Sequence, residues 1–368
     1  MNKHIPFLDL SQIPLDLKIA LKEKFSQMLD KGVFSGGEEV EILEKNLKEY
    51  LGINYALACS NGTDALELAL RALEIGSGDE VIVPAISWVS TAEAVALVGA
   101  KPVFIDTDAS GLMDLDLLES KISSRTKAII PVHLYGNMVD MEKLLLWSKK
   151  NKVAVIEDGA QSFGAVLKGK HAGTWGDIGC LSFYPTKNLG ALGEAGAVLT
   201  EDSILAEKLR NLLNHGQTFR DHHILVGRNA RIDSIQAGFL NVKLGFFSAW
   251  QKRRKNLVSI YLQELKDIAS ISLPQEILSP FHNAHLFIIK TSQRDDLRQF
   301  LAQKGIGTAI HYPEIIPYMK PYLDGQKYPV AEMMSKTVLS LPLNPWMKNA
   351  DVKRICKEIR NFGFQTLV

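Results

Sequence analysis

Hydrophobic positions along this chain follow two spacings, one typical of helices and one typical of strands. Residues 15–29 and 38–51 carry apolar side chains every three or four positions, as an amphipathic helix does. Short apolar runs typical of strands lie at 55–59, 80–83, 102–106 and 128–133. Helical segments, such as residues 64–70, alternate with these runs. This alternation predicts an α/β fold with a mostly parallel sheet and helices on both of its faces.

The pattern changes near residue 245. Helical spacing covers residues 232–244 and then 250–265, and fewer glycines follow. A strand is predicted at 285–290, a helix at 294–304, and a turn leading into a strand at 305–310. A chain of 368 residues is long for one compact domain. We therefore expect a large domain over residues 1–245, including an N-terminal arm and helix, and a smaller α+β domain over residues 246–368.

Two strands in the middle of the chain end in residues that carry chemistry. The apolar run 153–156 is followed at once by Glu157 and Asp158, and the run 178–184 is followed by Pro185, Thr186 and Lys187. In α/β sheets, ligands bind at the carboxyl ends of the strands. The sequence therefore predicts that Asp158 and Lys187 lie in the same crevice.

An aspartate paired with a lysine in this way suits pyridoxal phosphate (PLP) chemistry. The lysine amine forms a Schiff base with the cofactor aldehyde, and the aspartate keeps the pyridine nitrogen protonated so that the ring accepts electrons. At about 4 Å and an effective dielectric near 20, the ion pair contributes on the order of 4 kcal/mol. This corresponds to roughly three pKa units. The alternative for an isolated pair is that both residues are simply exposed on the surface.

Six motifs carry a family resemblance, namely EDGAQSFGA, SFYPTKNLGALGEAGAV, SNGTDAL, PVHLYG, GRNARID and HYP. Their order along the chain and their separations resemble the DegT/DnrJ/EryC1/StrS family of PLP-dependent nucleotide-sugar aminotransferases. The resemblance runs from about Pro6 to the C-terminus. It implies an aspartate-aminotransferase-like architecture (fold type I of PLP enzymes). It also implies that Lys187 is both the covalent tether and the proton carrier, with Asp158 at the ring nitrogen.

The same resemblance assigns the contacts of the cofactor. It implies that Gly62 and Thr63 hold the phosphate, although the residues alone equally fit an ordinary helix cap. Trp88 corresponds to the aromatic residue that stacks on the pyridine ring, the alternative being a core tryptophan. Gln161 corresponds to the residue that binds the ring hydroxyl, and Ser182 to a second phosphate contact.

One further cofactor contact is implied to come from a second copy of the chain. Asn229 corresponds to the asparagine that reaches the phosphate in the neighbouring subunit. The resemblance therefore implies a homodimer with composite active sites, in which a two-fold axis completes both sites at once.

Substrate contacts are implied at six residues, namely Phe34, Ser35, Tyr184, Arg231, His311 and Tyr312. Taken alone, the loop at Phe34 could be a plain connector between helices, and His311 could be a buried structural histidine. The chain departs from the family pattern twice. Ala195 replaces the third residue of the usual Gly-Glu-Gly-Gly, and EIIPY at 314–318 lacks the histidine that usually follows His-Tyr-Pro. The second change concerns the sugar site rather than the cofactor.

The implied reaction moves an amino group from L-glutamate to a nucleotide-linked keto-hexose, with a 3-keto sugar favoured over a 4-keto sugar. The product would serve amino-sugar, lipopolysaccharide or polysaccharide biosynthesis. An aminocyclitol aminotransferase acting on a keto-inositol and a PLP-binding sensor module remain alternatives. A sugar dehydratase of this family is disfavoured, because that branch carries histidine where this chain has Lys187. A Rossmann oxidoreductase is excluded, because no predicted strand is followed by the glycine fingerprint of dinucleotide-binding folds.

Composition narrows the possible partners and location. A net charge of +1 gives no electrostatic basis for binding nucleic acid or an anionic membrane. Three widely spaced cysteines, no signal peptide and no apolar run of roughly 20 residues predict a cytoplasmic protein that does not span a membrane. His222 and His223 lack further ligands at a suitable spacing, so no metal site is expected. The basic run 252–255 is expected on the solvated face of a helix.

Overall fold

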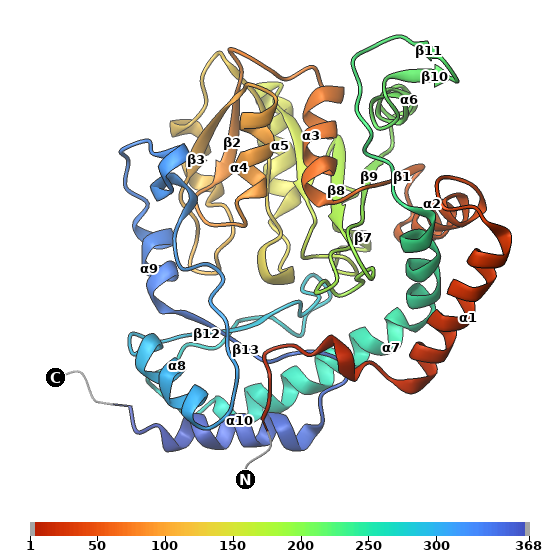
Figure 1. Ribbon diagram of the computed structural model, residues 1–368. Coiled ribbons are helices and arrows are strands. Elements are labelled where there is room, and N and C mark those ends of the chain that lie inside the picture. Colours follow the sequence, from red (N-terminus) through yellow and green to blue (C-terminus); the bar gives the residue numbers. More distant parts are fainter. Residues whose placement is uncertain (1–3, 365–368) are drawn as a thin grey trace.

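The computed structural model describes residues 4–364, so the ends of the two predicted domains, 1–3 and 365–368, lie outside the described residues (Figure 1). Within the described chain, a central sheet has the order β1-β9-β8-β5-β4-β2-β3. Its strands are β1 Tyr55–Cys59, β2 Glu80–Pro84, β3 Lys101–Ile105, β4 Thr126–Ile129, β5 Ala154–Asp158, β8 Ile178–Ser182 and β9 Gly196–Thr200. β3, β2, β4, β5 and β8 pair in parallel, whereas β9 is antiparallel to both β8 and β1. The predicted mostly parallel sheet is therefore confirmed.

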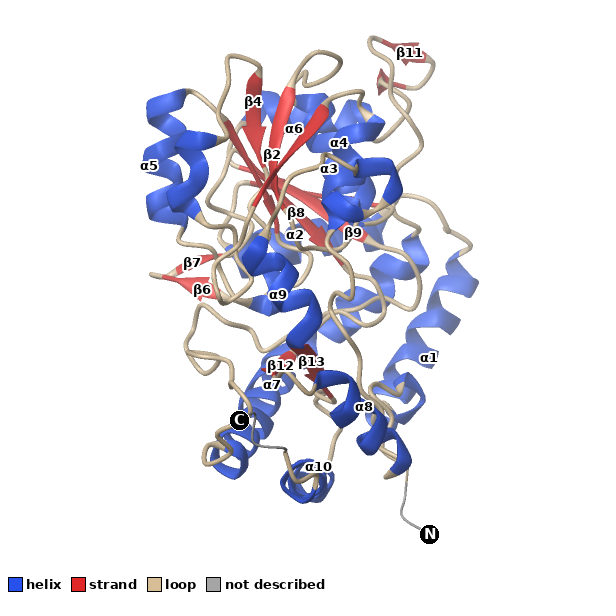
Figure 2. Ribbon diagram, turned by 90° about the vertical axis from the view of Figure 1, so that its left-hand side faces the viewer, coloured by secondary structure: helices blue, strands red, loops and turns tan. Residues whose placement is uncertain are grey.

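Helices surround this sheet, whose strands lie in the middle of Figure 2. They are α1 Leu15–Lys31, α2 Glu38–Leu51, α3 Gly62–Ala72, α4 Ser90–Leu97, α5 Met141–Asn151 and α6 Ser203–Leu212. α3 packs on β5, β8 and β9, and α2 packs on β1. Gly32 and Gly52 end α1 and α2 in the left-handed conformation, which glycine adopts without steric cost. Residues 38–51 and 55–59 thus form the elements that their patterns predict.

The C-terminal part forms a smaller α+β body, seen at the bottom of Figure 2. Its elements are β12 Phe287–Lys290, α8 Arg294–Gln303, β13 Val338–Leu341 and α10 Asn349–Asn361. Helix α9 Pro329–Thr337 instead packs through Ala331 and Met334 in the buried cluster of the central sheet. β12 and β13 pair antiparallel. A separate buried cluster, which includes Tyr261, Phe287, Leu301 and Ile355, holds this body together.

One helix, α7 Ser234–Leu265, replaces the two helices predicted at 232–244 and 250–265. The prediction of a break was wrong because a single glycine, Gly245, costs only about 1 kcal/mol in a helix and no proline interrupts the segment. α7 packs on α1 and α2 along one part and on α10 along another. The proposed boundary at residue 245 falls inside α7, and Ile5 from the N-terminal arm packs in the C-terminal cluster. The division at residue 245 stays a proposal.

The basic run 252–255 lies only partly on a solvated face, because Lys252 is exposed whereas Arg254 and Lys255 turn toward other loops. Arg254 is only 4% exposed, and its Nη1 donates a hydrogen bond to the carbonyl of Leu343 at 3.1 Å. Lys255 Nζ donates to the carbonyls of Ile277 at 2.5 Å and Ser279 at 2.8 Å. Burial lowers the pKa of Arg254 to about 10 and that of Lys255 to about 8. The expectation failed for these two cations because α7 is packed on both sides, so they bind loop carbonyls instead of water.

Shorter elements refine the remaining expectations. β4 ends at Ile129 rather than at residue 133, because Pro131 has no N–H to continue the ladder. In the described chain, residues 305–310 form only isolated bridges instead of a strand. The small hairpins and single-turn helices are β6 Val166–Leu167, β7 Lys170–His171, β10 Gln217–Phe219, β11 His222–His223, η1 Leu10–Gln12, η2 Leu115–Ser120, η3 Leu134–Gly136, η4 Ile316–Tyr318 and η5 Lys320–Tyr322. Among the described helices, none has the length and apolar character that crossing a bilayer requires.

Candidate active site

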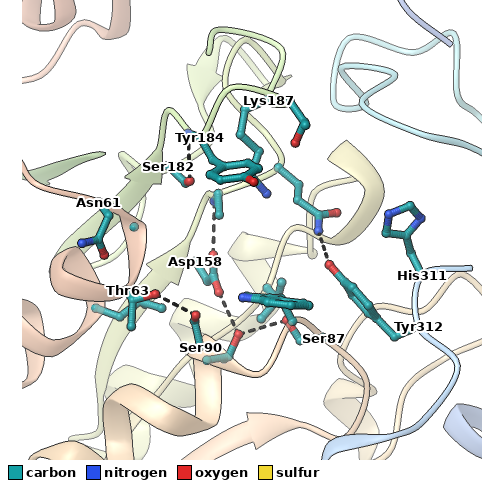
Figure 3. A pocket seen from close by; sticks show the side chains of 18 of the residues that line it. Asn61, Thr63, Ser87, Ser90, Asp158, Ser182, Tyr184, Lys187, His311 and Tyr312 are labelled. Carbon is teal, nitrogen blue, oxygen red and sulfur yellow. Dashed lines mark hydrogen bonds between the residues drawn. The ribbon is translucent and has the colours of Figure 1, made fainter. Parts of the chain in front are cut away.

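A cavity of about 840 Å³ opens where β5 and β8 end, facing residues 310–313 of the C-terminal body (Figure 3). Ten of the predicted site residues line it, namely Gly62, Thr63, Trp88, Asp158, Gln161, Ser182, Tyr184, Lys187, His311 and Tyr312. These residues come from distant parts of the sequence, and the parallel sheet brings them together.

Asp158 lies at the end of β5 and points into the cavity (Figure 3). Thr91 Oγ1 donates a hydrogen bond to its Oδ2 at 2.9 Å, and Ala160 N donates to its Oδ1 at 3.1 Å. Ser87 Oγ lies 2.9 Å from Thr91 Oγ1, which extends the chain of hydroxyl groups. Burial raises the pKa of Asp158, and the hydrogen bond from Thr91 opposes this rise. Such a carboxylate favours a cationic partner, which would let it ionise without an uncompensated buried charge.

Lys187 follows β8, whose register with β5 places Cys180 opposite Asp158. Its side chain extends into the same cavity (Figure 3). Burial lowers the pKa of Lys187 to about 8, while the charge of Asp158 opposes the decrease. An amine with this pKa exchanges protons readily near neutral pH. The two neighbouring strand ends therefore bring the acid and the amine into one cavity, as the sequence predicts.

The lowered pKa of Lys187 predicts how stability depends on pH when no cofactor is bound. The folded pKa is about 8 against an ordinary 10.5, so between these values the unfolded chain binds more protons. The contribution of Lys187 to stability therefore rises with pH over this window and is unfavourable below it. We expect Lys187→Met to unfold at a temperature about 2–4 °C higher than the wild type at pH 7.

Thermal unfolding of both cofactor-free proteins across the pH range checks this expectation. The advantage of Lys187→Met should shrink as the pH rises from 8 towards 10.5. A temperature difference that is the same at pH 7 and pH 10 would show that the substitution acts through packing and not through the charge.

Residue Glu157 lies beside Asp158 on β5, and the alternation of a strand directs it to the opposite face. Its carboxylate accepts hydrogen bonds from the backbone N–H groups of Gly173 at 2.9 Å, Trp175 at 2.5 Å and Gly176 at 2.7 Å. It also pairs with His133 Nε2 at 2.9 Å. One carboxylate thus joins β5 to the far end of the connection that leads into β8.

The N-terminus of α3 forms a small polar cup beside Ser182. Thr63 Oγ1 lies 2.7 Å from Ser90 Oγ. Asp64 N donates to Oδ1 of the cap residue Asn61 at 2.8 Å, whereas the N–H groups of Gly62 and Thr63 have no partner within the helix. A side-chain carbon added to Gly62 would lie 2.7 Å from Cβ of Ser182, so only glycine leaves this space open. Unpaired N–H groups, hydroxyl groups and the positive end of a helix suit an anion such as a phosphate.

Filling this cup tests its role. We expect Gly62→Ala to weaken PLP binding by roughly 10–100-fold, because the added methyl group overlaps Ser182 at a cost of about 1–3 kcal/mol. Titration of the cofactor-free protein with PLP measures the change. In the double variant with Ser182→Gly, the overlap is removed and affinity should return to that of Ser182→Gly alone. An equally weak double variant would contradict the steric explanation.

The opposite wall of the cavity is built around Gln161. Its Oε1 accepts a hydrogen bond from Tyr135 N at 2.6 Å, and its Nε2 donates to the Tyr312 hydroxyl at 3.0 Å. The ring of Trp88 lies 5.9 Å from that of Tyr312. Burial, together with the charge of Lys187, lowers the pKa of His311 to about 4, so this imidazole is neutral.

Four predicted site residues do not reach the cavity of their own chain, namely Phe34, Ser35, Asn229 and Arg231. Ser35 forms an isolated bridge with Asp233, and Asn229 Oδ1 accepts a hydrogen bond from Arg231 Nε at 3.0 Å. Phe34 is 45% exposed. Within residues 4–364, no three His, Cys, Asp or Glu residues gather in a group that could hold a metal ion.

Sequence reasoning missed several residues of the site. Ser87, Ser90 and Thr91 lie on both sides of Trp88. The Thr91 hydroxyl contacts Asp158, the Ser87 hydroxyl contacts Thr91, and the Ser90 hydroxyl contacts Thr63 in the α3 cup. A run of three hydroxyl residues around one candidate aromatic residue was the available signal. His285 also lines the cavity, but its only signal was its place at the start of a predicted strand, 285–290.

A sequence profile described as the DegT/DnrJ/EryC1/StrS aminotransferase family matches residues 16–360. The chain belongs to this family. A similar family member is the UDP-N-acetyl-3-dehydro-alpha-D-glucosamine 3-aminotransferase of Acidithiobacillus ferrooxidans, 40% identical over 98% of each chain. The crystal structure of DesV of S. venezuelae superposes with a TM-score of 0.94 at 36% identity and covers 99% of each chain. NtdA of Bacillus subtilis, whose structure holds PMP, has a TM-score of 0.93 at 32% identity over 98% of this chain and 85% of NtdA.

Enzymes of the DegT/DnrJ/EryC1/StrS family are PLP-dependent aminotransferases of the predicted fold. The residues of this chain fit that cofactor. The open cup at Gly62 matches a phosphate, Asp158 provides a buried carboxylate, and Lys187 provides an amine in the same cavity. The predicted family, fold class, enzyme class and cofactor are therefore confirmed.

Proposed function

We propose that this protein transfers an amino group from L-glutamate to a nucleotide-linked keto-hexose, with a 3-keto sugar favoured. The observation that carries the proposal is the pairing of Lys187 and Asp158 in one cavity beside an open anion cup. When bound, PLP supplies an electron sink that stabilises negative charge on the carbon bonded to the amino group. The side chains of this protein supply proton transfer, orientation and charge.

Lys187 carries the proton in both halves of the proposed reaction. Its Nζ accepts the proton from the α-carbon of glutamate, because burial keeps its pKa near 8 and leaves an accessible lone pair. In the second half, the same atom gives a proton to the sugar carbon that receives the amino group. Asp158 would form an ion pair with the positively charged ring nitrogen. This pair would offset the free-energy cost of burying the Asp158 carboxylate in its ionised form.

The other predicted cofactor contacts would hold the ring in place. Gly62, Thr63 and Ser182 surround the cup proposed for the phosphate. Trp88 is exposed at the cavity wall, where its ring is available for stacking. Gln161 is fixed through its bonds to Tyr135 and Tyr312, and its second Nε2 hydrogen remains for the ring hydroxyl.

Support for the sugar comes from a relative and from the cavity wall. The Acidithiobacillus ferrooxidans relative is named for a 3-keto UDP sugar. Tyr184, His311 and Tyr312 line the cavity beyond Lys187, and we propose them as sugar contacts. Rapid mixing of the yellow holoenzyme with L-glutamate should bleach its visible absorbance, and a matching keto-sugar should restore it. Absence of bleaching would refute L-glutamate as the amino donor, whereas bleaching without recovery by any keto-sugar would refute only the sugar.

A homodimer with shared sites is part of the proposal. Large apolar side chains are exposed on α1 and on the segment around the β10–β11 hairpin, namely Leu15, Ile19, Leu29, Phe219, Ile224 and Val226. Figure 1 shows that this hairpin projects from the body of the protein. Exposed apolar patches of this kind mark protein interfaces. A partner supplying Phe34, Ser35, Asn229 and Arg231 would explain why these residues miss the cavity of their own chain.

Mixing two inactive variants tests the shared site. Lys187→Ala removes the amine, and we expect Asn229→Ala to weaken the phosphate site of the partner. If Asn229 acts across a two-fold axis, each mixed dimer contains one intact and one doubly altered site. After unfolding and refolding together, an equal mixture should therefore recover about a quarter of the wild-type activity. Recovery that does not exceed the sum of the two variants would place Asn229 in its own subunit.

The cellular setting completes the proposal. An amino sugar made in this way would serve lipopolysaccharide, polysaccharide or related amino-sugar biosynthesis. We propose a cytoplasmic location, which agrees with the state of Cys59, Cys180 and Cys356. All three are buried free thiols.

A further inference from the structure

His285 enters the cavity from the C-terminal body and has no role in the function proposed so far. It precedes β12 and is only 8% exposed. Its Nδ1 lies 3.1 Å from Oδ1 of Asn188, the residue that follows Lys187. His285 N donates to Asn283 Oδ1 at 2.9 Å, which fixes the backbone of the histidine. The ring is therefore held between the lysine loop and the C-terminal body.

The contacts of Asn188 determine which side of its side-chain amide is the oxygen and which is the nitrogen. Its Nδ2 lies 3.1 Å from the carbonyl oxygen of Asn283 and 3.1 Å from Oε1 of Gln251. Gln251 Nε2 also donates to the Asn283 carbonyl at 3.2 Å, so Gln251 presents its oxygen to Asn188. A carbonyl oxygen only accepts hydrogen bonds, so the amide nitrogen of Asn188 must face Asn283. Oδ1 of Asn188 consequently faces His285.

This orientation determines which nitrogen of His285 carries the hydrogen. Oδ1 of Asn188 is an acceptor, so Nδ1 of His285 must be the donor of the 3.1 Å bond. Burial holds the pKa of His285 well below its usual value, and the nearby charges of Lys187 and Arg254 add to the decrease. The ring is thus neutral, and its other nitrogen, Nε2, carries an unshared electron pair. Among residues 4–364, Nε2 has no hydrogen-bond partner, and the residue lines the cavity.

An acceptor in this position discriminates between the two proposed substrates. The carboxylates of glutamate carry only acceptor atoms, and these repel an electron pair. A hexose presents several hydroxyl groups, each of which can donate a hydrogen bond. A ligand that displaces water from Nε2 without supplying a donor leaves this acceptor unpaired at a cost in free energy, so the site favours a ligand that supplies one.

We propose that Nε2 of His285 accepts a hydrogen bond from a hydroxyl group of the sugar substrate, with Asn188 fixing the ring for this purpose. His285 is then a specificity residue of the sugar half-reaction, and Asn188 is a positioning residue. The inference rests on the proposed function, because it takes a nucleotide-linked hexose as the ligand of this cavity.

Two substitutions of His285 distinguish the role of Nδ1 from that of Nε2. In His285→Asn, the short amide can still donate to Asn188, but no acceptor remains at the position of Nε2. In His285→Gln, the longer side chain can place its oxygen near that position. We expect His285→Asn to weaken binding of UDP-N-acetylglucosamine or dTDP-glucose to the holoenzyme by about 5–10-fold, the effect of one lost neutral hydrogen bond. His285→Gln should lose less than about threefold.

Isothermal titration with these two non-reacting nucleotide sugars measures binding without turnover. His282→Asn serves as the matched control, because His282 lies on the same loop, accepts from Ala284 N at 3.0 Å and lines a different cavity. The control should leave sugar binding unchanged even if it lowers the unfolding temperature. Equal binding by wild type and His285→Asn, or an equal loss in His282→Asn, would overturn the inference.

Rapid mixing with glutamate separates failure of this inference from failure of the proposed function. His285→Asn should slow restoration of the yellow colour by the keto-sugar about 5–10-fold, while bleaching by glutamate changes less than about twofold. Equal slowing of both halves would mean that His285 acts on Lys187 instead of the sugar. Wild-type enzyme that does not bleach refutes the proposed function, but the sugar titration still decides the role of His285. If neither nucleotide sugar binds the wild type, the inference about His285 and the proposed function are both refuted.

Discussion

Replacing Lys187 with alanine is expected to lower the transamination rate by about 10³-fold or more. The substitution removes the proposed covalent tether of the cofactor, which is also the atom proposed to move the proton in both half-reactions, and proton transfer alone contributes roughly 10²–10⁴-fold. Steady-state turnover with L-glutamate and a keto-sugar measures the loss. The visible absorbance of the protein should also change, because the proposed bond between Lys187 and the cofactor could no longer form.

Lys187→Arg is the matched variant, because it keeps a positive charge near Asp158 but has no amine of suitable pKa. Its activity should be as low as that of Lys187→Ala. Substantial activity in the arginine variant would mean that position 187 contributes charge and not proton transfer, and the proposed mechanism would then fail.

Replacing Asp158 with asparagine is expected to slow turnover by roughly 10²–10³-fold while leaving the cofactor bound. The substitution keeps the size of the side chain but removes the negative charge, and an ion pair of about 4 kcal/mol corresponds to roughly three pKa units on the ring nitrogen. The visible spectrum should therefore persist, and its dependence on pH should shift. Rate measurements and a pH titration of the spectrum together check both parts.

Thr91→Val provides the comparison for this second experiment. It removes the hydrogen bond of 2.9 Å to Asp158 but keeps the carboxylate. We expect a loss of only about 3–10-fold, since one hydrogen bond to a charged group is affected. If Thr91→Val and Asp158→Asn were equally slow, the orientation of the carboxylate would matter more than its charge.

Strand ends account for what the sequence predicted well. Asp158 and Lys187 directly follow apolar runs, and parallel pairing of β5 with β8 brings such positions together. The bounds of α2 and β1 also agreed, because Gly52 ends the helix at the residue where the periodic pattern stops. In these regions the local pattern and the tertiary packing favour the same structure.

Packing between distant segments accounts for what the sequence did not show. Thr91 contacts Asp158 across 67 positions, and Asn188 contacts His285 across 97 positions. No periodic pattern encodes such pairs, because each segment is regular by itself. The burial of Arg254 was missed for the same reason, since a basic run is polar in sequence and its carbonyl partners lie on other loops.

The two neighbouring acids of β5 have different roles: Asp158 faces the cavity, and Glu157 binds the connection between β5 and β8. This difference affects which part of the chain can change in length. Glu157 binds the N–H groups of Gly173, Trp175 and Gly176, so both ends of the excursion between β5 and β8 meet at one carboxylate. A segment closed at its base in this way can be lengthened or shortened at its tip for only a small loop entropy cost. We therefore expect the turn between β6 and β7 to tolerate insertions, tags or grafted peptides, leaving the chemistry at Asp158 undisturbed.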